Sequence, residues 1–285
     1  QDWLGALSDP ESRKTLPIPF EKLSEQLGGW AVGKLHLIGG RSSEHKTTFA
    51  RACAAHLAAQ QISCCYHTAE DSDLDIAGRT LADHSTALDV RALMHGTGPW
   101  GRQSIDADTL SRILAETQTS IEGPVGQHMR IIDVPNPRLS YLIGAIKVEA
   151  ARGCQAYFFD FLQLIRPDGK SRPDNDWWRF CVASLAGLAK QLKIAIVCTS
   201  QIEKSGTQAS SDDDRLPRAD EMPFGAVLRQ GAFGCIMVGT RVDGGGRVQL
   251  VVEIDKWKSA QNVRVSGRAG HVFEIDPGHD RITER

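Results

Sequence analysis

The stretch that decides the fold is Leu35-His36-Leu37-Ile38-Gly39-Gly40-Arg41-Ser42-Ser43-Glu44-His45-Lys46-Thr47-Thr48. Its short apolar run is typical of a buried strand, and a helical pattern begins at Lys46, directly after the polar turn. A glycine followed six residues later by Lys-Thr at a strand-to-helix turn is typical of a phosphate-binding loop. In such loops backbone N–H groups surround the anion, the lysine reaches the outer phosphates and the hydroxyl binds Mg²⁺. The stretch therefore predicts a nucleoside triphosphate site.

One position of this loop departs from the usual pattern. His45 stands where G-x-x-x-x-G-K-[ST] has its second glycine, which normally allows positive φ and a close approach of the phosphates. Histidine is among the other residues that tolerate positive φ, so we expect the loop to form. The alternatives are a chance match and a loop that has lost its activity. The expected nucleotide ligands are Gly40, Arg41, Ser42, Ser43, Glu44, His45, Lys46, Thr47 and Thr48.

The rest of the chain predicts an α/β fold with a mainly parallel sheet flanked by helices. Apolar runs separated by helical segments are typical of parallel strands that are buried on both faces. After residue 240 the strand-like runs follow one another without helices, which predicts an antiparallel β-hairpin extension at the C-terminus. Residues 1–28 contain three prolines and predict an N-terminal arm or linker, followed by one core over residues 29–285. The strand-like runs are residues 35–38, 62–68, 131–134, 156–159, 194–198, 235–238, 248–254, 263–265 and 272–275.

Composition excludes several classes of protein. The chain has 285 residues, 41% hydrophobic and 24% charged, which is too apolar for a disordered protein. We find no signal peptide and no apolar run long enough to cross a membrane, so we expect a cytoplasmic protein without a membrane partner. The net charge of −2 indicates no bulk positive field, and the seven cysteines indicate a reduced core rather than disulfides. Because the chain begins with Gln1 rather than Met, we expect a piece of a longer protein.

Polar residues close several of the predicted parallel strands. Glu70 follows one strand and is placed to activate water, while Asp160 ends the most apolar strand and is placed to bind Mg²⁺. Ser200-Gln201 close the next strand, where an amide could sense the phosphate. Because carboxyl ends of parallel strands meet at one edge of a sheet, we expect these residues near Lys46.

From about residue 14 onward the sequence resembles the RecA-like C-terminal motor domain of hexameric replicative DNA helicases, of the DnaB type and its phage primase-helicase relatives. Phe159-Asp160-Phe161-Leu162-Gln163-Leu164-Ile165 is the most specific match, because it is similar to the Walker B signature of that family. The loop at residues 40–50 is similar to Walker A, and Glu70-Asp71-Ser72 with Arg79 resembles the segment of the catalytic glutamate. Further matches are residues 16–29, 188–201, 228–230 and 256–258.

The resemblance implies a P-loop NTPase that hydrolyses ATP with Mg²⁺ to translocate on single-stranded DNA and unwind duplex DNA. Lys46 would neutralise phosphate charge, Thr47 and Asp160 would organise Mg²⁺, and Glu70 would activate water. Gln201 would couple the phosphate state to the DNA-facing loops. The resemblance also implies further nucleotide contacts: Arg79, Arg241 as a base-stacking residue, and Lys256 and Lys258 from the neighbouring subunit.

The partners that the resemblance implies are single-stranded DNA, other copies of the chain in a hexameric ring, a primase or other N-terminal domain, and a helicase loader. Trp177-Trp178 fit either base stacking or the core.

Two alternatives stay open: a filament-forming recombination or repair ATPase, and a nucleotide-binding ring scaffold with a decayed loop at His45. The candidate DNA contacts lie on two charged loops and just beyond them: Lys170, Arg172, Lys204, Arg215, Arg218, Phe224 and Gly225.

Overall fold

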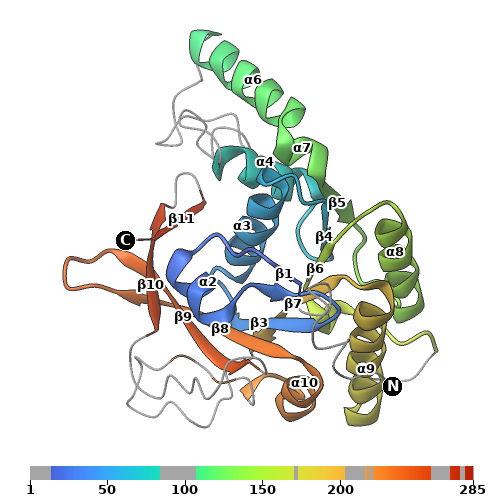
Figure 1. The fold of residues 1–285 in the computed structure, drawn as a ribbon. Coiled ribbons are helices and arrows are strands. Elements are labelled where there is room, and N and C mark those ends of the chain that lie inside the picture. The colour runs from blue at the N-terminus through green and yellow to red at the C-terminus, as the bar shows by residue number, and fades with distance from the viewer. Residues whose placement is uncertain are drawn as a thin grey trace.

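The computed structural model describes residues 14–83, 107–169, 173–202, 216, 218, 221–257, 270–276 and 280–284. Its centre is a nine-stranded sheet with the order β11-β10-β9-β8-β3-β7-β6-β4-β5 (Figure 1). The strands are β3 (Leu35–Arg41), β4 (Cys64–Thr68), β5 (Met129–Asp133), β6 (Ala156–Asp160), β7 (Ala195–Ile202), β8 (Gly234–Val242), β9 (Val248–Trp257), β10 (His271–Asp276) and β11 (Arg281–Glu284).

The sheet has a parallel part and an antiparallel part. Every pairing from β8 through β3, β7, β6 and β4 to β5 is parallel. The pairings of β8 with β9, β9 with β10 and β10 with β11 are antiparallel. This confirms the predicted α/β class and its C-terminal antiparallel extension, although the predicted strand at 263–265 lies outside the described residues.

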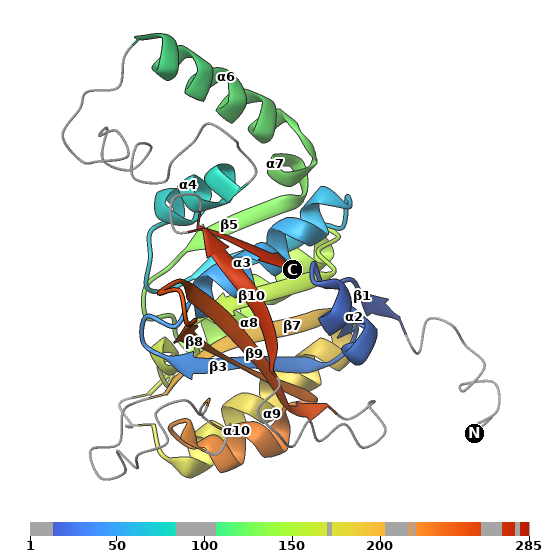
Figure 2. The ribbon, with the colours of Figure 1, turned by 90° about the vertical axis from the view of Figure 1, so that its left-hand side faces the viewer.

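Helices cover both faces of the sheet (Figure 2). One face packs against α2 and α3, with Ile38, Phe49 and Phe158 in its core. The other face packs against α8, α9 and α10, with Leu37, Phe159 and Leu185 in its core. Among the described residues, no helix combines the length and apolar character that a membrane span requires. The helical elements are α2 (Glu21–Leu27), α3 (Lys46–Ala59), α4 (Asp73–Asp83), α6 (Ala107–Glu122), α7 (Pro124–His128), α8 (Leu139–Ala151), the 3₁₀ turn η2 (Leu162–Leu164), α9 (Asn175–Leu192) and α10 (Gly225–Gly231).

Strand β3 shows how an uninterrupted apolar strand serves two cores. Successive side chains of a strand point to opposite faces, so Ile38 enters the core under α3 while Leu35 and Leu37 enter the core under α9. A strand that is buried on both faces has no polar side to alternate with. The helix-covered sheet thereby brings the carboxyl ends of β3, β4, β6 and β7 to one edge.

The N-terminal boundary that we predicted at residue 28 does not separate an arm from the core. Strand β1 (Thr15–Leu16) pairs with β2 (Trp30–Ala31), and Leu16 is buried in the core under α3. The ring of Phe20 stacks on that of Phe49 with a centroid distance of 5.3 Å. Residues 15–28 therefore belong to the main body, while residues 1–13 lie outside the described residues.

Candidate nucleotide-binding site

The predicted phosphate-binding loop joins β3 to α3. The parallel register of β3 and β7 sets Gly40 opposite Gln201. A Cβ atom on Gly40 would lie 2.6 Å from the carbonyl oxygen of Val238, so only glycine fits there without a shift of the backbone. The first glycine of the motif is thus required by the packing of β3 against β8.

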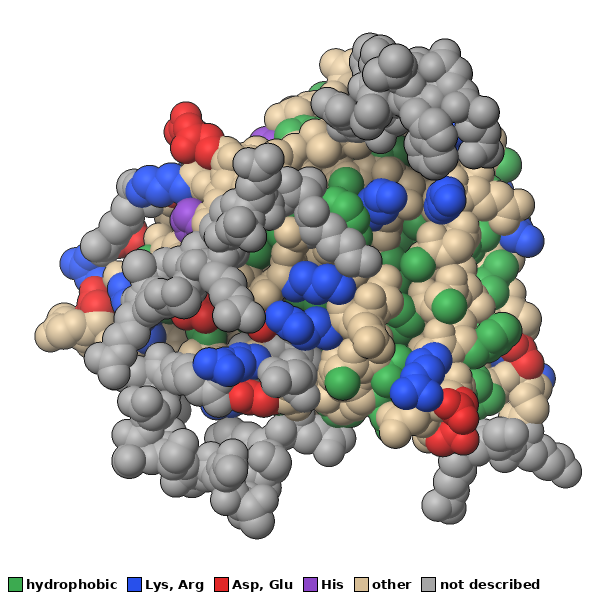
Figure 3. Space-filling view, turned by 60° about the horizontal axis from the view of Figure 1, so that its bottom comes forward, with side chains coloured by type: hydrophobic (Ala, Val, Ile, Leu, Met, Phe, Trp, Pro, Cys, Tyr) green, Lys and Arg blue, Asp and Glu red, His purple; other side chains and the backbone are tan. Residues whose placement is uncertain are grey.

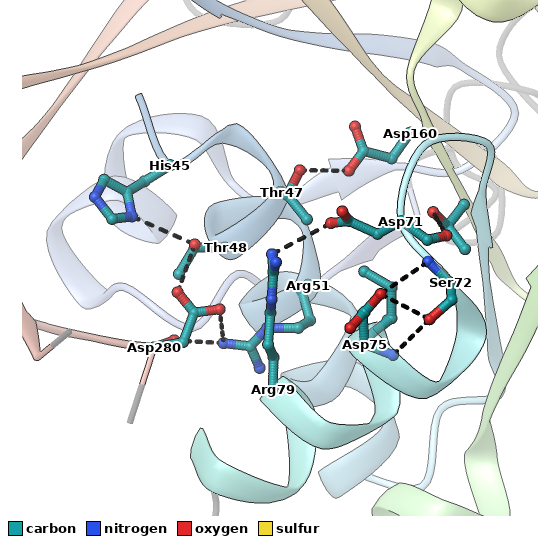
Figure 4. Close-up of polar contacts among 12 residues, drawn as sticks. His45, Thr47, Thr48, Arg51, Asp71, Ser72, Asp75, Arg79, Asp160 and Asp280 are labelled. Atoms are coloured by element: carbon teal, nitrogen blue, oxygen red, sulfur yellow. Dashed lines mark hydrogen bonds and ion pairs between the residues drawn. The ribbon is translucent and has the colours of Figure 1, made fainter. Parts of the chain in front are cut away.

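His45 adopts the backbone conformation that glycine usually supplies at this place. Its φ of 58° and ψ of 26° lie in the left-handed region. Its ring Nδ1 lies 3.4 Å from Oγ1 of Thr48, one turn into the helix (Figure 4). Burial lowers the pKa of His45, and the carboxylate of Asp280 partly opposes this shift. The loop therefore forms with a histidine at this position, because His45 itself adopts the left-handed conformation.

Lys46 is held inside the loop. Its side chain is buried, and its Nζ donates a hydrogen bond to the carbonyl oxygen of Arg41 at 2.5 Å. Burial lowers the pKa of Lys46, and the carboxylates of Asp160, Glu44 and Glu70 oppose that shift. A bound polyphosphate would stabilise the charged form of this buried lysine, because its oxygens accept hydrogen bonds from Nζ.

Glu44 braces the loop from within. Its Oε2 accepts a hydrogen bond of 2.6 Å from the backbone N–H of Arg41, and its Oε1 lies 3.7 Å from the Arg41 guanidinium. A carboxylate that accepts a backbone N–H holds the turn in the manner of a helix cap. This acidic side chain is an internal support of the loop.

Asp160 is the polar centre of the site. Its Oδ2 accepts hydrogen bonds from Thr47 Oγ1 at 2.6 Å and from the Tyr66 hydroxyl at 2.9 Å. Its Oδ1 accepts a hydrogen bond from Thr199 Oγ1. Burial and the Asp160 carboxylate raise the pKa of Tyr66, so this phenol stays a donor. The structure brings Thr47 and Asp160 together as the sequence predicted, but the sequence analysis missed Tyr66 and Thr199.

These oxygens suit a hard cation. Among the described residues no cluster of three or more His, Cys, Asp or Glu side chains could hold a metal ion by itself. Mg²⁺ is usually bound by one or two protein oxygens, with phosphates and water completing six ligands. The Thr47 hydroxyl and the Asp160 carboxylate, 2.6 Å apart, fit that requirement.

Glu70 lies two residues beyond the end of β4 and is exposed. Partial burial and the carboxylates of Asp160 and Asp71 raise its pKa, while Lys46 and Arg79 oppose the shift. Arg79 on α4 forms an ion pair of 3.2 Å with Asp71. Figure 4 shows the Arg79 guanidinium turned toward Asp71, the residue that follows the predicted glutamate.

A second ion cluster joins the loop helix to the C-terminal hairpin. Asp280 accepts a hydrogen bond of 2.8 Å from Thr48 Oγ1, and its Oδ2 lies 3.4 Å from the guanidinium of Arg51. Figure 4 shows the Arg51 guanidinium beside Asp280. The fully buried Arg51 also pairs with Asp83 at 3.2 Å. The sequence analysis missed this cluster, since its members are up to 232 residues apart and carry no local motif.

Gln201 is the penultimate residue of β7, beside the loop, and Gln163 holds it there. The Gln163 amide donates hydrogen bonds to Ser200 Oγ at 2.8 Å and to the Gln201 carbonyl oxygen at 3.0 Å. In return, the backbone N–H of Gln201 donates to Gln163 Oε1 at 3.2 Å. The predicted sensor position is thereby locked to the segment that follows Asp160.

Two residues predicted as nucleotide contacts have partners elsewhere in their own chain. The Nζ of Lys256 donates hydrogen bonds to the carbonyl oxygens of Arg229, Gln230 and Ala232, of which the last is 2.8 Å long. It therefore caps the end of α10, where a cation interacts favourably with the helix dipole. Arg241 Nε donates to Gln249 Oε1 at 3.1 Å across the β8–β9 pair, and Lys258 lies outside the described residues.

Among the residues predicted to contact DNA, Lys170, Arg172, Lys204 and Arg215 lie outside the described residues. Arg218 is exposed. The ring of Phe224 instead stacks on buried Trp178 at 5.6 Å, and Gly225 is buried in α10, so both pack in the core. Figure 3 shows Lys and Arg side chains scattered among hydrophobic and acidic ones over the described part of one face.

Comparisons with known proteins agree with this geometry. The family model described as DnaB-like helicase C terminal domain matches residues 15–230. The replicative DNA helicase DnaB of Treponema pallidum (strain Nichols) is 29% identical over 216 residues, which cover 72% of this chain and 45% of that protein. The chain thus spans about half the length of this curated relative.

Two solved structures share the fold. The "ATPase Domain of G40P" is 16% identical with a TM-score of 0.76, over 99% of this chain and 95% of that one. "The Structure Of A DnaB-Like Replicative Helicase And Its Interactions With Primase" is 16% identical with a TM-score of 0.77, over 99% of this chain and 65% of that one. They confirm the predicted RecA-like fold. Because the family model covers most of its length, the chain belongs to the family of DnaB-like helicase C-terminal domains.

Proposed function

We propose that the chain is an ATP-driven helicase motor that translocates on single-stranded DNA and unwinds duplex DNA. The observation that carries this proposal is the meeting of Lys46, Thr47 and Asp160 at one sheet edge, with Glu70 just beyond. A strand-end carboxylate beside a loop lysine and hydroxyl is the arrangement that phosphoryl transfer requires.

Each residue has a role that follows from its surroundings. The ammonium group of Lys46 would exchange its hydrogen bond to Arg41 for phosphate oxygens. Thr47 and Asp160 would hold Mg²⁺, which supplies positive charge against the phosphates when bound. Glu70, whose raised pKa makes it a better proton acceptor, would orient and deprotonate the attacking water.

The remaining predicted partners belong to the same proposal. We infer that copies of the chain form a hexameric ring with single-stranded DNA in its channel, contacted by the residues around Arg218. A primase or another N-terminal domain and a helicase loader would act with the ring. One structural relative was solved as a DnaB-like replicative helicase with its interactions with primase, which supports a primase partner. We infer a cytoplasmic location, which agrees with membership of a bacterial replicative helicase family.

The test is turnover of Mg²⁺-ATP by the assembled chain, with and without single-stranded DNA. We expect DNA to stimulate hydrolysis, and K46A to abolish hydrolysis while its circular dichroism spectrum and melting temperature stay unchanged. Lys147, exposed on α8, gives the matched control K147A, which should keep wild-type turnover. Hydrolysis at the wild-type rate by K46A would refute the site assignment. Nucleotide binding without any turnover by the wild-type chain would favour the scaffold with a decayed loop.

A further inference from the structure

Gln163 is the side chain that connects the two central strand ends of the site. All three of its hydrogen bonds go to Ser200 and Gln201, the last residues before the end of β7. Both N–H groups of its amide donate, and its oxygen accepts, so the amide is committed to this contact. Gln163 therefore holds β7 in place and has no donor left for a nucleotide.

The position of this contact links it to the phosphate-binding loop. Gln163 lies three residues after Asp160, and Gln201 is paired with Gly40 in the β3–β7 register. A shift of the loop at Gly40 therefore moves the backbone of Gln201, and the Gln163 amide passes the movement to η2. Rigid elements joined by hydrogen bonds can carry coupling between sites in this way.

The same contact lies at the start of both segments that we predict to bind DNA. The chain continues from η2 to Asp168, whose carboxylate accepts the backbone N–H of Ser140 at 3.2 Å and so fastens this segment to α8. Beyond lie Lys170 and Arg172. From β7 the chain continues past Ile202 toward the second charged segment. Gln163 thus joins η2 to the end of β7, and each of these elements precedes one of the two segments.

We propose that Gln163 is a positioning residue that couples nucleotide binding to DNA binding by tying the ends of β6 and β7 together. This inference rests on the proposed function. With the tie intact, nucleotide at Gly40 and Lys46 changes the affinity for DNA. Without it, each site keeps its own affinity but no longer responds to the other.

The experiment measures the affinity of the assembled chain for fluorescent oligothymidylate, with ADP and with a non-hydrolysable ATP analogue. Allosteric coupling typically changes affinity by about 5- to 150-fold, so we expect at least about a fivefold difference between the two nucleotides in the wild type. Q163M keeps the length of the side chain without its hydrogen bonds and should reduce the difference to below about twofold. Q191M, on the exposed face of α9, is the matched control and should keep the wild-type difference.

A merely structural role would lower the melting temperature and leave the ratio of the two affinities unchanged, and that result in Q163M would overturn the proposal. Should Q163M fail to fold, Q163E keeps the acceptor for the Gln201 N–H and loses both donors. Q163E should then reduce the ratio partly, and an unchanged ratio would again contradict us. A wild-type chain that binds neither nucleotide nor DNA would instead overturn the proposed function itself.

Discussion

Replacement of Arg51 tests whether the C-terminal hairpin is fastened to the loop helix through a buried ion cluster. The Arg51 side chain is fully buried, between Asp83 at 3.2 Å and Asp280 at 3.4 Å, whose side chains are 13% and 17% exposed. Arg51 also donates a hydrogen bond to the backbone carbonyl of Asp280. R51M would keep most of the apolar stem and leave the Asp280 carboxylate without the Arg51 cation, while Asp83 keeps its ion pair of 3.3 Å with Arg281.

The expected loss is large. Removing one partner of a buried ion pair costs about 3–5 kcal/mol, because the remaining charge stays buried without compensation. For a chain of this size about 1 kcal/mol corresponds to about 2 °C, so the melting temperature of R51M should fall by about 6–10 °C. The control R179M removes an exposed ion pair on α9, which contributes only about 0.3–0.5 kcal/mol.

The assay is differential scanning calorimetry of the wild type, R51M and R179M at one protein concentration, with D280N and the double variant completing a mutant cycle. Arg51 and Asp280 are in contact, so their effects should deviate from additivity by about 0.5–3 kcal/mol. A fall of less than about 2 °C in R51M, or additive effects in the cycle, would refute the view that this cluster fastens the hairpin.

Four further predictions follow from other contacts. H45G should change the free energy of unfolding by less than about 1 kcal/mol in urea titrations, because relief of the left-handed conformation is offset by the greater chain entropy of glycine. K256M should destabilise the chain by about 1–2 kcal/mol in the same titrations, since two carbonyls of α10 and that of the following Ala232 lose their donor. Burial lowers the pKa of His36 and of His67 from 6.5 to about 4, so these two histidines bind protons more tightly in the unfolded chain than in the folded one. Stability is therefore complete above pH 6.5 and is lost as the pH falls toward 4, by about 2 kcal/mol per histidine at pH 5, and a flat profile would contradict this. All seven cysteines are buried, so a thiol reagent should label the native chain only at the rate of its unfolding.

Local patterns predicted the centre of the site well. The strand, turn and helix around Gly40 and Lys46 are encoded within one short stretch, where an apolar run, glycines and a helical pattern all agree. The meeting of Thr47 with Asp160, 113 residues later, was predictable because carboxyl ends of parallel strands share an edge. Such inferences need only the order of the strands and no knowledge of packing.

Contacts set by tertiary packing were not predictable in this way. The contact of Lys256 with the end of α10 is one example, because no local pattern in the sequence places these two segments side by side. The four residues of β11 carry a single buried apolar side chain, Ile282, which is too weak a signal for a strand. For residues 15–28 a signal existed in the spacing of Leu16, Ile18 and Phe20, which alternate as in a buried extended segment. The three prolines of residues 1–28 favour a linker instead, because proline interrupts regular helices and strands.

The supports of the loop explain how it accommodates His45. A left-handed conformation costs a non-glycine residue about 1–2 kcal/mol, which is small against several buried hydrogen bonds. Glu44 fixes the start of the turn through the N–H of Arg41, and Asp280 fixes the first turn of α3 through Thr48. Both supports act on residues adjacent to His45 or within one helical turn of it, so the backbone there is determined from both sides. The conformational role of the missing glycine is thus replaced by neighbouring residues, and the small change in unfolding free energy expected for H45G tests this replacement.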